Sequence, residues 1–566
     1  MKILRNWSIV LAACAMACVQ EAGATGGVGE NRAVGEAATV GDPVSAADGA
    51  FSTSFPLLDL GGPMGLAFVF HYNQSLPETI QMMPVGIPVN SGYWWSPLAG
   101  CALFTRYAPD STCSILLDDG SQVAFRKTDG LWVQEETGTA PLNYALQVQT
   151  DGANRLWLYL MDPVAERLYI FDSRTLSDTG DLRYFARCVI DRNGHRLDYR
   201  YDDTQRDNPV VTNITDNLGR SLAFTYENDG MGNPCLTAVT DQAGRTARFL
   251  YETDAPDYPH DNAILRAIVQ PDGGTNRLDF TWLVWNEFTL DGNLVAVTYP
   301  RGNAPVTNRY GVLVLPETYG DQGYARVTNQ VDALGHGFAL AVDTNDFRST
   351  ATFSDGTQAG FFQTSAFSFP TQMLDACGHA MRFEQDAQGR PLAAVDRAGG
   401  TSSFAYDTEA GFVSAATNAV GAGMQFEYET VQQSFTNPVN AQVVTFSFRQ
   451  LKRVLYPDES FEEYARDGRG NVTEQRDRDG HVWSYAYDNR GMVTNQTNPD
   501  GGFVACRYDA AGRLAGVRDS ETGEQCCLYD EAGRLVSIVT PDGATYAWGL
   551  DAMDRMTAFT NASGAV

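Results

Sequence analysis

The chain has 566 residues, of which 43% are hydrophobic and 11% aromatic, so it can bury a large core. Its formal net charge is −29. This charge argues against DNA or RNA as a partner, because phosphate binding needs a basic surface, and it suits a soluble protein that is secreted or held at a surface. The abundance of Gly and other turn-forming residues favours a β-rich class.

The first residues have the pattern of an export signal. Two basic residues precede an apolar run from 7 to 19, which small residues follow and which is too short to span a bilayer as a helix. We interpret residues 1–24 as a signal peptide with cleavage after Ala24. The alternative is a lipobox-like Leu-Ala-Ala-Cys, which would leave a lipid anchor on Cys14. Both readings predict a secreted protein or one in the cell envelope, on its extracellular face.

Two regions follow the signal. Residues 25–40 are rich in Gly, Ala and Glu and offer little to bury, so we predict a linker. Residues 41–185 contain several short alternating segments that predict β-hairpins. Within this region Cys101 and Cys113 could form a disulfide across one hairpin, which an exported protein permits.

From residue 186 the sequence repeats itself. Asp191-Arg-Asn-Gly-His, Asp216-Asn-Leu-Gly-Arg and Asp241-Gln-Ala-Gly-Arg are spaced by 25 residues, and each precedes an alternating strand. From about residue 458 the period is a regular 21 residues, which is typical of a repeat architecture. The defining positions of the regular repeats are Asp467, Gly470, Tyr487, Asp488, Gly491, Tyr508, Asp509, Gly512, Tyr529, Asp530, Gly533 and Asp551.

Each regular repeat predicts a strand, a turn, a second strand and a second turn. In Asp-x-x-Gly the carboxylate caps backbone N–H groups and Gly takes the positive φ. Alternating residues such as Trp483, Tyr485 and Tyr487 predict a strand with one buried face. In the next strand two apolar columns are three residues apart, and this odd spacing predicts a bulge. An insertion at about 430–448 predicts one lengthened hairpin.

These motifs resemble a known family. The pattern Tyr-x-Tyr-Asp-x-x-Gly-Arg-Leu, nearest in the segment that begins at Cys527, resembles the YD repeats of bacterial Rhs proteins and of the teneurin YD shell. The segments 41–75 and 92–98 resemble the entry module that opens the repeat region of Rhs proteins. The resemblance implies an all-β fold in which a sheet of YD-repeat hairpins curls into an open or partial shell. It assigns 41–185 to the entry module and 186–566 to the repeats.

No motif predicts catalysis, a cofactor or a metal site. His195, His336, His379 and His481 each occupy a repeat turn and are expected to cap or pack there. Neither a Gly-x-Ser-x-Gly elbow nor a P-loop is present in the sequence. Paired acids such as Asp118-Asp119 lie near turns and are read as solvated, with calcium binding as the alternative.

The remaining cysteines raise one alternative. Cys506 and Cys527 fall in one column of adjacent repeats, where they are expected to pack as small buried residues; a disulfide between them is the other reading.

Three hypotheses for function follow. The leading one is a non-enzymatic scaffold, secreted or on the cell surface, that binds or encloses a partner protein or glycan. The second, implied by the family resemblance, is the N-terminal shell portion of an Rhs-type polymorphic toxin; no Asp-Pro-x-Gly cleavage segment and toxin domain occur in this sequence. The third is a hidden glycosidase, which needs two carboxylates facing a groove.

Overall fold

The computed structural model confirms the all-β class. It describes residues 39–40, 44–45, 50–74, 94–95, 102–105, 112–116, 122–134, 144–163, 165–175, 182–202, 210–228, 234–252, 264–285, 288–314, 323–344, 346–363, 371–375, 377–386, 390–407 and 411–563. Every regular element within these ranges is a β-strand. The described residues contain no helix that is long and apolar enough to cross a membrane. The predicted signal peptide, Cys14 and most of the predicted linker lie outside these ranges.

The strands fall into three groups along the chain. The first group is β1 (Thr39–Val40), β2 (Val44–Ser45), β3 (Ser52–Asp59), β4 (Ala67–Asn73) and β5 (Trp94–Trp95). The second is β6 (Ala102–Thr105), β7 (Thr112–Leu116), β8 (Gln122–Thr128), β9 (Leu131–Gln134), β10 (Ala145–Thr150), β11 (Leu156–Asp162), β12 (Arg167–Thr175) and β13 (Leu182–Asp191). The third is β14 (Arg196–Asp202), β15 (Val210–Asp216), β16 (Ser221–Asn228), β17 (Pro234–Asp241), β18 (Thr246–Glu252), β19 (Ile264–Val269), β20 (Thr275–Trp285), β21 (Phe288–Thr298), β22 (Val306–Val314), β23 (Gly323–Asp332), β24 (Gly337–Asp343), β25 (Arg348–Phe353), β26 (Gln358–Phe362), β27 (Gln372–Leu374), β28 (Ala380–Gln385), β29 (Pro391–Val395), β30 (Thr401–Tyr406), β31 (Val413–Thr417), β32 (Gly423–Thr436), β33 (Val443–Leu455), β34 (Phe461–Arg466), β35 (Val472–Arg476), β36 (Val482–Tyr487), β37 (Val493–Thr497), β38 (Phe503–Tyr508), β39 (Leu514–Asp519), β40 (Gly523–Tyr529), β41 (Leu535–Val539), β42 (Thr545–Leu550) and β43 (Met556–Thr560).

Most strands belong to one sheet of 38 strands. From β10 to β43 each strand pairs antiparallel with the next one along the chain, as in β12–β13, β20–β21 and β42–β43. Such neighbour-to-neighbour pairing is what hairpin repeats produce, because each repeat adds strands beside the previous one. A separate three-stranded sheet contains β3, β4 and β5.

The large sheet forks at β13. The C-terminal part of this strand pairs with β14 through residues such as Val189 and Leu197. Its N-terminal part pairs instead with β6, where Phe185 lies opposite Ala102. Between the two parts, the pairing of β13 with β12 skips Arg187, which marks a bulge. This fork carries the branch β6–β9 away from the main wall.

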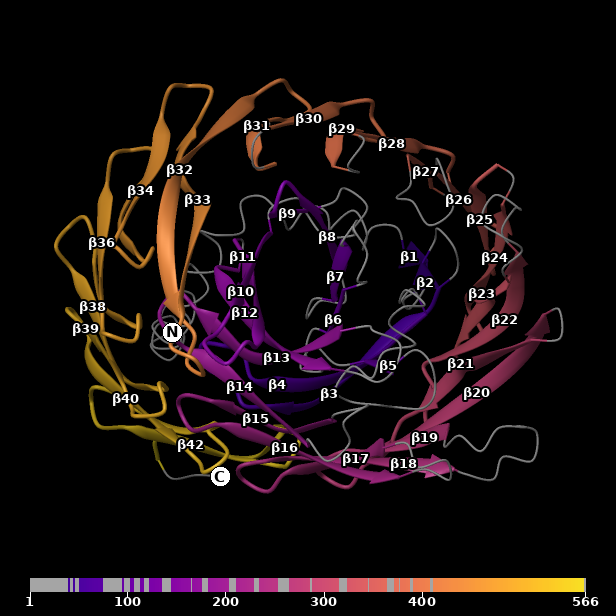
Figure 1. Ribbon diagram of the computed structural model, residues 1–566, viewed down its shortest axis with the longest axis horizontal. Coiled ribbons are helices and arrows are strands. Elements are labelled where there is room, and N and C mark those ends of the chain that lie inside the picture. Colours follow the sequence, from indigo (N-terminus) through magenta and orange to yellow (C-terminus); the bar gives the residue numbers. More distant parts are fainter. Residues whose placement is uncertain are drawn as a thin grey trace.

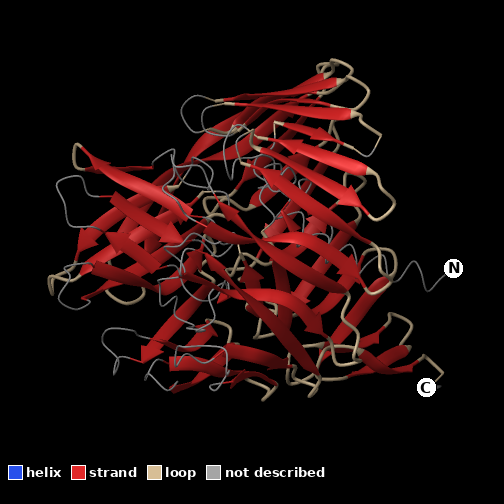
Figure 2. Ribbon diagram, turned by 90° about the vertical axis from the view of Figure 1, so that its right-hand side faces the viewer, coloured by secondary structure: helices blue, strands red, loops and turns tan. Residues whose placement is uncertain are grey.

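The sheet curls into a shell that surrounds its own N-terminal strands. In Figure 1 the wall runs from β14 through β43 and returns towards β14–β16, with β3, β4 and β6–β13 inside. Figure 2 shows the same wall from the side, built of strands over its whole height. The sheet does not close into a barrel by strand pairing: among the described strands, β43 has a register only with β42. The expectation of a curled sheet is therefore confirmed.

Two apolar cores pack parts of the wall against strands inside this shell. In the larger core, Phe68 of β4 packs against Phe224 and Phe249 of the wall, with ring centroids 5.9 and 6.1 Å apart. In the smaller core, Trp157 and Tyr159 of β11 lie in one cluster with Phe446 of the β32–β33 hairpin. The wall therefore encloses strands that belong to its own chain.

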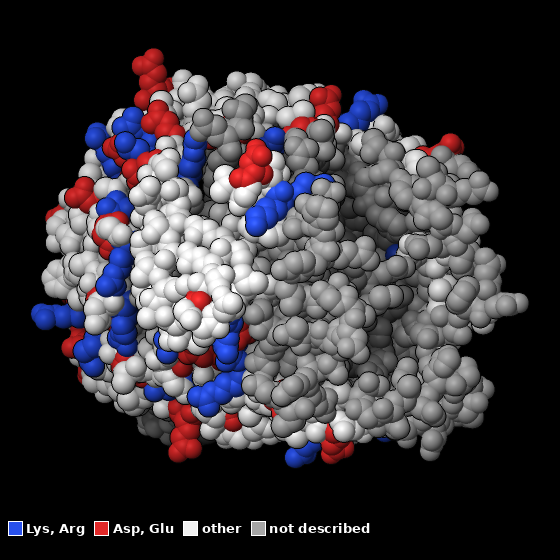
Figure 3. All heavy atoms as spheres, in the orientation of Figure 1, with Lys and Arg blue, Asp and Glu red and all other residues white. Residues whose placement is uncertain are grey.

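The long hairpin β32–β33 confirms the predicted insertion. Its strands have 14 and 13 residues, against 5 and 6 in the flanking β31 and β34. Its tip reaches β11, because the Tyr159 hydroxyl donates to Gln442 Oε1 at 3.0 Å and accepts from Asn437 at 3.1 Å. Figure 3 shows a patch with almost no charged atoms over the region of this hairpin and the neighbouring β10–β12, with charged residues of both signs around it.

Candidate functional site

The regular repeats place the predicted aspartates in one kind of turn. In the turn that begins at Asp509, the backbone N–H of Asp509 donates to the carbonyl of Arg513 at 2.9 Å, and that of Gly512 donates to the Asp509 carbonyl at 3.1 Å. Asp509 Oδ1 accepts the Arg513 backbone N–H at 2.8 Å, and Oδ2 accepts Arg513 Nε at 2.7 Å. Gly512 has φ +74, which a residue with a side chain rarely adopts. The carboxylate thus satisfies backbone and guanidinium donors together.

The other predicted aspartates make the same turn with small changes. Asp530 and Asp551 bind the arginine four residues on, as Asp509 does. At Asp467 the fifth residue is Asn471, whose side-chain amide donates to the carboxylate at 2.9 Å. The positions Gly470, Gly491 and Gly533 all have positive φ.

The tyrosine column ties each repeat to its own preceding strand. The hydroxyls of Tyr487, Tyr508 and Tyr529 donate to the carbonyls of residues 15 positions earlier, at 2.6, 2.9 and 2.9 Å. Burial raises the pKa of Tyr487 to about 12. In this column the hydroxyl bonds to the backbone of the wall itself, which agrees with a packing role for the aromatic ring.

The predicted bulge follows each of these tyrosines. Tyr487 lies opposite Val493 while Ala486 lies opposite Asn495, so Thr494 is the extra residue. The same shift occurs beside Tyr508 and Tyr529. The odd spacing of the apolar columns is explained by this extra residue, and the prediction is confirmed.

A ladder of arginines joins successive turns along one rim. Arg490 donates to the carbonyl of Asp509 at 3.1 Å, and Arg513 to that of Asp530 at 3.4 Å. Arg534 continues the ladder to the carbonyl of Asp551. Sequence reasoning assigned no role to these arginines, although an Arg after Asp-x-x-Gly recurs in the repeats.

The inner face of the wall changes along the chain. In the early part, Phe224 and Phe249 are buried beneath β4. In the regular repeats the same face carries Trp483, Tyr485 and Trp548, which are only partly buried. No described residue after 454 belongs to either of the two cores. The aromatic face therefore continues past the part that the chain's own N-terminal strands cover.

One open cleft lies on this face, beside Tyr485 and Tyr487. Its volume is about 340 Å³, and its other lining residues include Asp467, Asn471 and Asn489. Their polar groups are already engaged, since Asn471 binds both Asp467 and Asn193, and Arg469 donates to the Asn489 carbonyl at 2.6 Å. The cleft therefore combines two tyrosine rings with polar residues, several of which already bind one another.

Two turns with histidine bring potential metal ligands together. In Asp375, Cys377 and His379, and again in Asp477, Asp479 and His481, the ligand atoms lie within 4.8 Å of one another. Sequence spacing did not reveal these groups, because they depend on the turn geometry. Arg397 lies 3.3 Å from the Asp375 carboxylate and opposes a cation there.

The histidines His195, His336 and His481 lie in the repeat turns as predicted, but the aspartate carboxylate caps each turn and the histidine N–H is the donor. The backbone N–H of His195 donates to Asp191 Oδ1 at 2.8 Å, and its ring Nδ1 lies 2.8 Å from Oδ2 of the same residue. His336 and His481 have the same backbone bond at 2.8 Å.

No two cysteines of the described residues are joined by a disulfide. Burial raises the pKa of Cys113 well above its ordinary value. Its predicted partner Cys101 lies outside the described residues, so the disulfide stays a prediction. Cys506 and Cys527 are both buried and are not joined to each other by a disulfide, which agrees with their expected packing role.

The comparison with protein families gives the decisive match. The RHS Repeat family matches residues 466–502 and 529–566, which contain the turns at Asp467, Asp488, Asp530 and Asp551 and the tyrosines Tyr487 and Tyr529. The chain carries RHS repeats. The matched segments do not include residues 41–185, so the entry module stays a prediction. No curated protein matches the chain.

Several solved structures share a low similarity with this RHS-repeat chain. A TcdB2–TccC3–TEV crystal structure has 13% identity and a TM-score of 0.32, covering 75% of this chain and 26% of the other. A Tc holotoxin pore of Photorhabdus luminescens has 13% identity and a TM-score of 0.26, covering 90% and 25%. The N-terminal domain of SpvB from Salmonella typhimurium has 11% identity and a TM-score of 0.21, covering 55% and 98%. The chain spans about a quarter of the first two.

Proposed function

We propose that this RHS-repeat chain is a non-enzymatic scaffold, secreted or held at the cell surface, whose curled sheet encloses a partner polypeptide. The observation that carries the proposal is the inner face of the wall. In the early repeats this face packs on an apolar hairpin from β3 and β4, and in the regular repeats it continues with partly buried Trp483, Tyr485 and Trp548. A second apolar polypeptide segment would bury these rings as β4 buries Phe249, and burial of apolar area is the main source of such affinity.

The same geometry favours a polypeptide over a glycan as the guest. Sugar recognition needs polar groups that are free to bond the hydroxyls of the ligand. In the cleft beside Tyr487 the phenol hydroxyl donates to the Val472 carbonyl at 2.6 Å, and neighbouring polar side chains bind one another. A glycan remains an outcome of the test below.

The absence of enzymatic activity is part of the proposal. The repeat aspartates, which would be the natural acid and base of a glycosidase, accept backbone and arginine donors within their own turns, as Asp509 and Asp530 do. These bonds hold each carboxylate as a structural group. If the purified chain hydrolysed any aryl glycoside in a panel, this result would contradict the proposed absence of enzymatic activity.

The test of enclosure uses a guest polypeptide that is known to be unfolded. Reduced and carboxymethylated lactalbumin, which stays unfolded, is mixed with the refolding chain and then digested with trypsin. Enclosure predicts a protected lactalbumin fragment that co-elutes with the chain and is lost in Trp483→Ala. Val482→Ala is the matched control, because Val482 lies on the opposite face of β36 and is 38% exposed. Absence of any protected fragment, or binding of soluble glycans instead, would contradict enclosure of a polypeptide.

A second candidate is the shell portion of an Rhs-type polymorphic toxin, as the RHS-repeat match suggests. The intact mass of the exported protein from its native host distinguishes the two candidates. A mass that corresponds to residues 25–566 supports the self-contained scaffold. A much larger mass supports the toxin shell, in which the enclosed polypeptide is part of the same chain.

A further inference from the structure

Among the turns that begin at Asp467, Asp488, Asp509, Asp530 and Asp551, one departs from the others. In the turns that begin at Asp467, Asp488, Asp509 and Asp530 the fourth residue is glycine with positive φ. In the turn that begins at Asp551 the fourth residue is Asp554, with φ +62. A side chain in this region carries a steric cost, which Asp tolerates better than most residues. A residue held in such a conformation in place of the usual glycine indicates that its side chain has a role.

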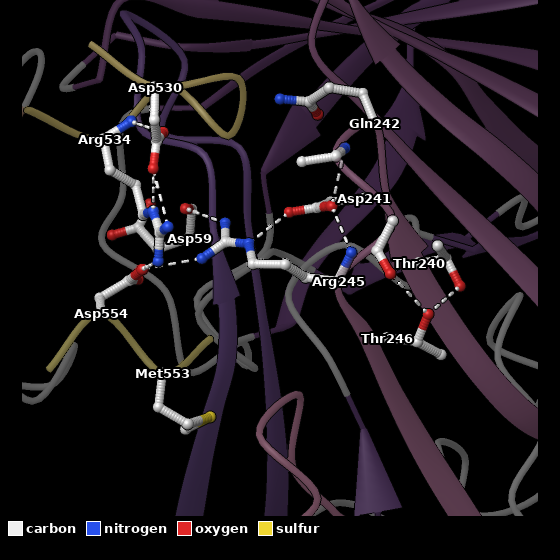
Figure 4. A network of polar contacts seen from close by, with 12 residues as sticks. Asp59, Thr240, Asp241, Gln242, Arg245, Thr246, Asp530, Arg534, Met553 and Asp554 are labelled. Carbon is white, nitrogen blue, oxygen red and sulfur yellow. Dashed lines mark hydrogen bonds and ion pairs between the residues drawn. The ribbon is translucent and has the colours of Figure 1, made fainter. Parts of the chain in front are cut away.

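The carboxylate of Asp554 joins the two ends of the wall. Its Oδ1 accepts Arg534 at 3.1 Å, from the preceding repeat, and Arg245 at 2.8 Å, from a turn 309 residues earlier. Arg245 is only 9% exposed, and its Nε donates to Asp241 Oδ2 at 2.7 Å while Nη2 donates to the Asp59 carbonyl at 3.3 Å. Figure 4 shows Asp554 between the two guanidinium groups.

Other turns meet along the same line, which we call the seam. Arg555 reaches the Asp272 carboxylate, which lies in a turn of the early part of the wall. Asn193 donates to Asn471 at 3.1 Å. One side of the seam consists of Asn193, Leu218, Arg245 and Asp272, and the other of Asn471, Gly512, Asp554 and Arg555. Apart from the approach of Leu218 to the glycine Gly512, these contacts across the seam join side chains, whereas neighbouring strands of the wall share backbone ladders.

This contrast makes the seam the weakest line of the shell. A backbone ladder opens only when several hydrogen bonds break together, but an ion-pair contact opens when its charges are screened or removed. The net charge of −29 also favours a more open arrangement through self-repulsion. Without the Asp554 carboxylate, Arg245 and Arg534 would face each other with less counter-charge and would repel.

We propose that the seam is a latch through which the shell opens and closes, and that Asp554 is the residue that holds it shut. Opening gives access to the inner face of the regular repeats from the side of the wall. The proposal concerns the chain without any guest, so it can fail while enclosure of a polypeptide still holds.

Neighbouring cysteines on opposite faces of β40 report on opening. Cys527 is 6% exposed and lies on the inner face, opposite Ile538, whereas Cys526 lies on the outer face beside Arg507 and Glu524. The rate at which a bulky polyethylene-glycol maleimide modifies each thiol is followed by peptide mass spectrometry. Modification of Cys527, unlike that of Cys526, requires the maleimide to reach the inside of the shell.

The latch predicts that Asp554→Asn and Asp554→Gly both raise the modification rate of Cys527 about tenfold, which is the effect expected for a partly buried charged pair. Cys526 should not change, and rising NaCl should accelerate Cys527 in the unmodified chain. Asp554→Gly also introduces the usual turn residue, so misfolding of the turn would not explain its effect. The matched control Glu531→Gln removes an equal charge from an exposed position of the adjacent turn. Unchanged Cys527 rates, an equal rise at Cys526, or an equal effect of Glu531→Gln would each overturn the latch.

Discussion

Removal of one turn carboxylate should loosen a single repeat by a predictable amount. Asp530 accepts two bonds from Arg534, at 2.9 Å from the backbone N–H and 2.8 Å from Nε, and its side chain is 24% exposed. Bonds to charged groups stabilise by about 1.5–3 kcal/mol when buried, so at this exposure we expect a loss of about 2 kcal/mol for Asp530→Ala. Asp530→Asn keeps an acceptor for the backbone N–H and should lose about 1 kcal/mol.

Hydrogen exchange of the amides in β40 and β41 measures this loss locally, which suits a repeat protein whose neighbours can open independently. The expected rise in the opening constant is about 30-fold for Asp530→Ala and about 5-fold for Asp530→Asn. Asp500→Ala is the control, because its carboxylate accepts only the Gly502 backbone N–H, at 2.9 Å, on an exposed turn. Equal effects of Asp530→Ala and Asp500→Ala would refute the role given to the arginine bond.

Three further predictions concern the tyrosine column, stability at low pH and the predicted disulfide. Tyr508→Phe leaves the buried Val493 carbonyl without its 2.9 Å bond and should cost about 1–2 kcal/mol in local hydrogen exchange, whereas Tyr485→Phe, which loses a 3.3 Å bond, should cost less than half of that. Burial raises the pKa of Asp530, but the bonds from Arg534 outweigh this effect and hold the pKa below its ordinary value. The stabilisation is therefore present above about pH 4 and is lost as the pH falls through the folded-state pKa. Thermal unfolding at stepwise lower pH should show this loss of stability, and a melting temperature that does not change with pH would contradict it. Peptide mapping of the exported protein without reductant should find Cys101 linked to Cys113, and alkylation of both thiols would exclude the bridge.

The local features of the repeats were predictable because they depend on short stretches of sequence. The Asp-x-x-Gly turn requires a capping carboxylate and a positive φ within four residues, and Gly512 and Gly533 supply the second. The bulge at Thr494 follows from the spacing of apolar residues within one strand. Each of these patterns recurs in several repeats, so agreement between the copies strengthens the prediction.

The fork and the seam were not predictable, because they join residues far apart in the chain. The fork depends on β6 pairing with β13 beside the bulge at Arg187, and nothing periodic marks that pairing. The seam depends on the summed twist of many strands, since small rotations between neighbours accumulate over the sheet. Asp554 is visible in the sequence as a departure from glycine, but its partner Arg245 lies 309 residues away.

The curled shell is the central claim, and small-angle X-ray scattering of the purified chain tests it most directly. A compact chain of 566 residues should have a radius of gyration of roughly 25 Å. The continuous run of strands from β10 to β43, if it did not curl, would extend to about 160 Å at its strand spacing and would give a radius of gyration of roughly 50 Å. A value near 25 Å is the predicted result, and a value near 50 Å would contradict the shell.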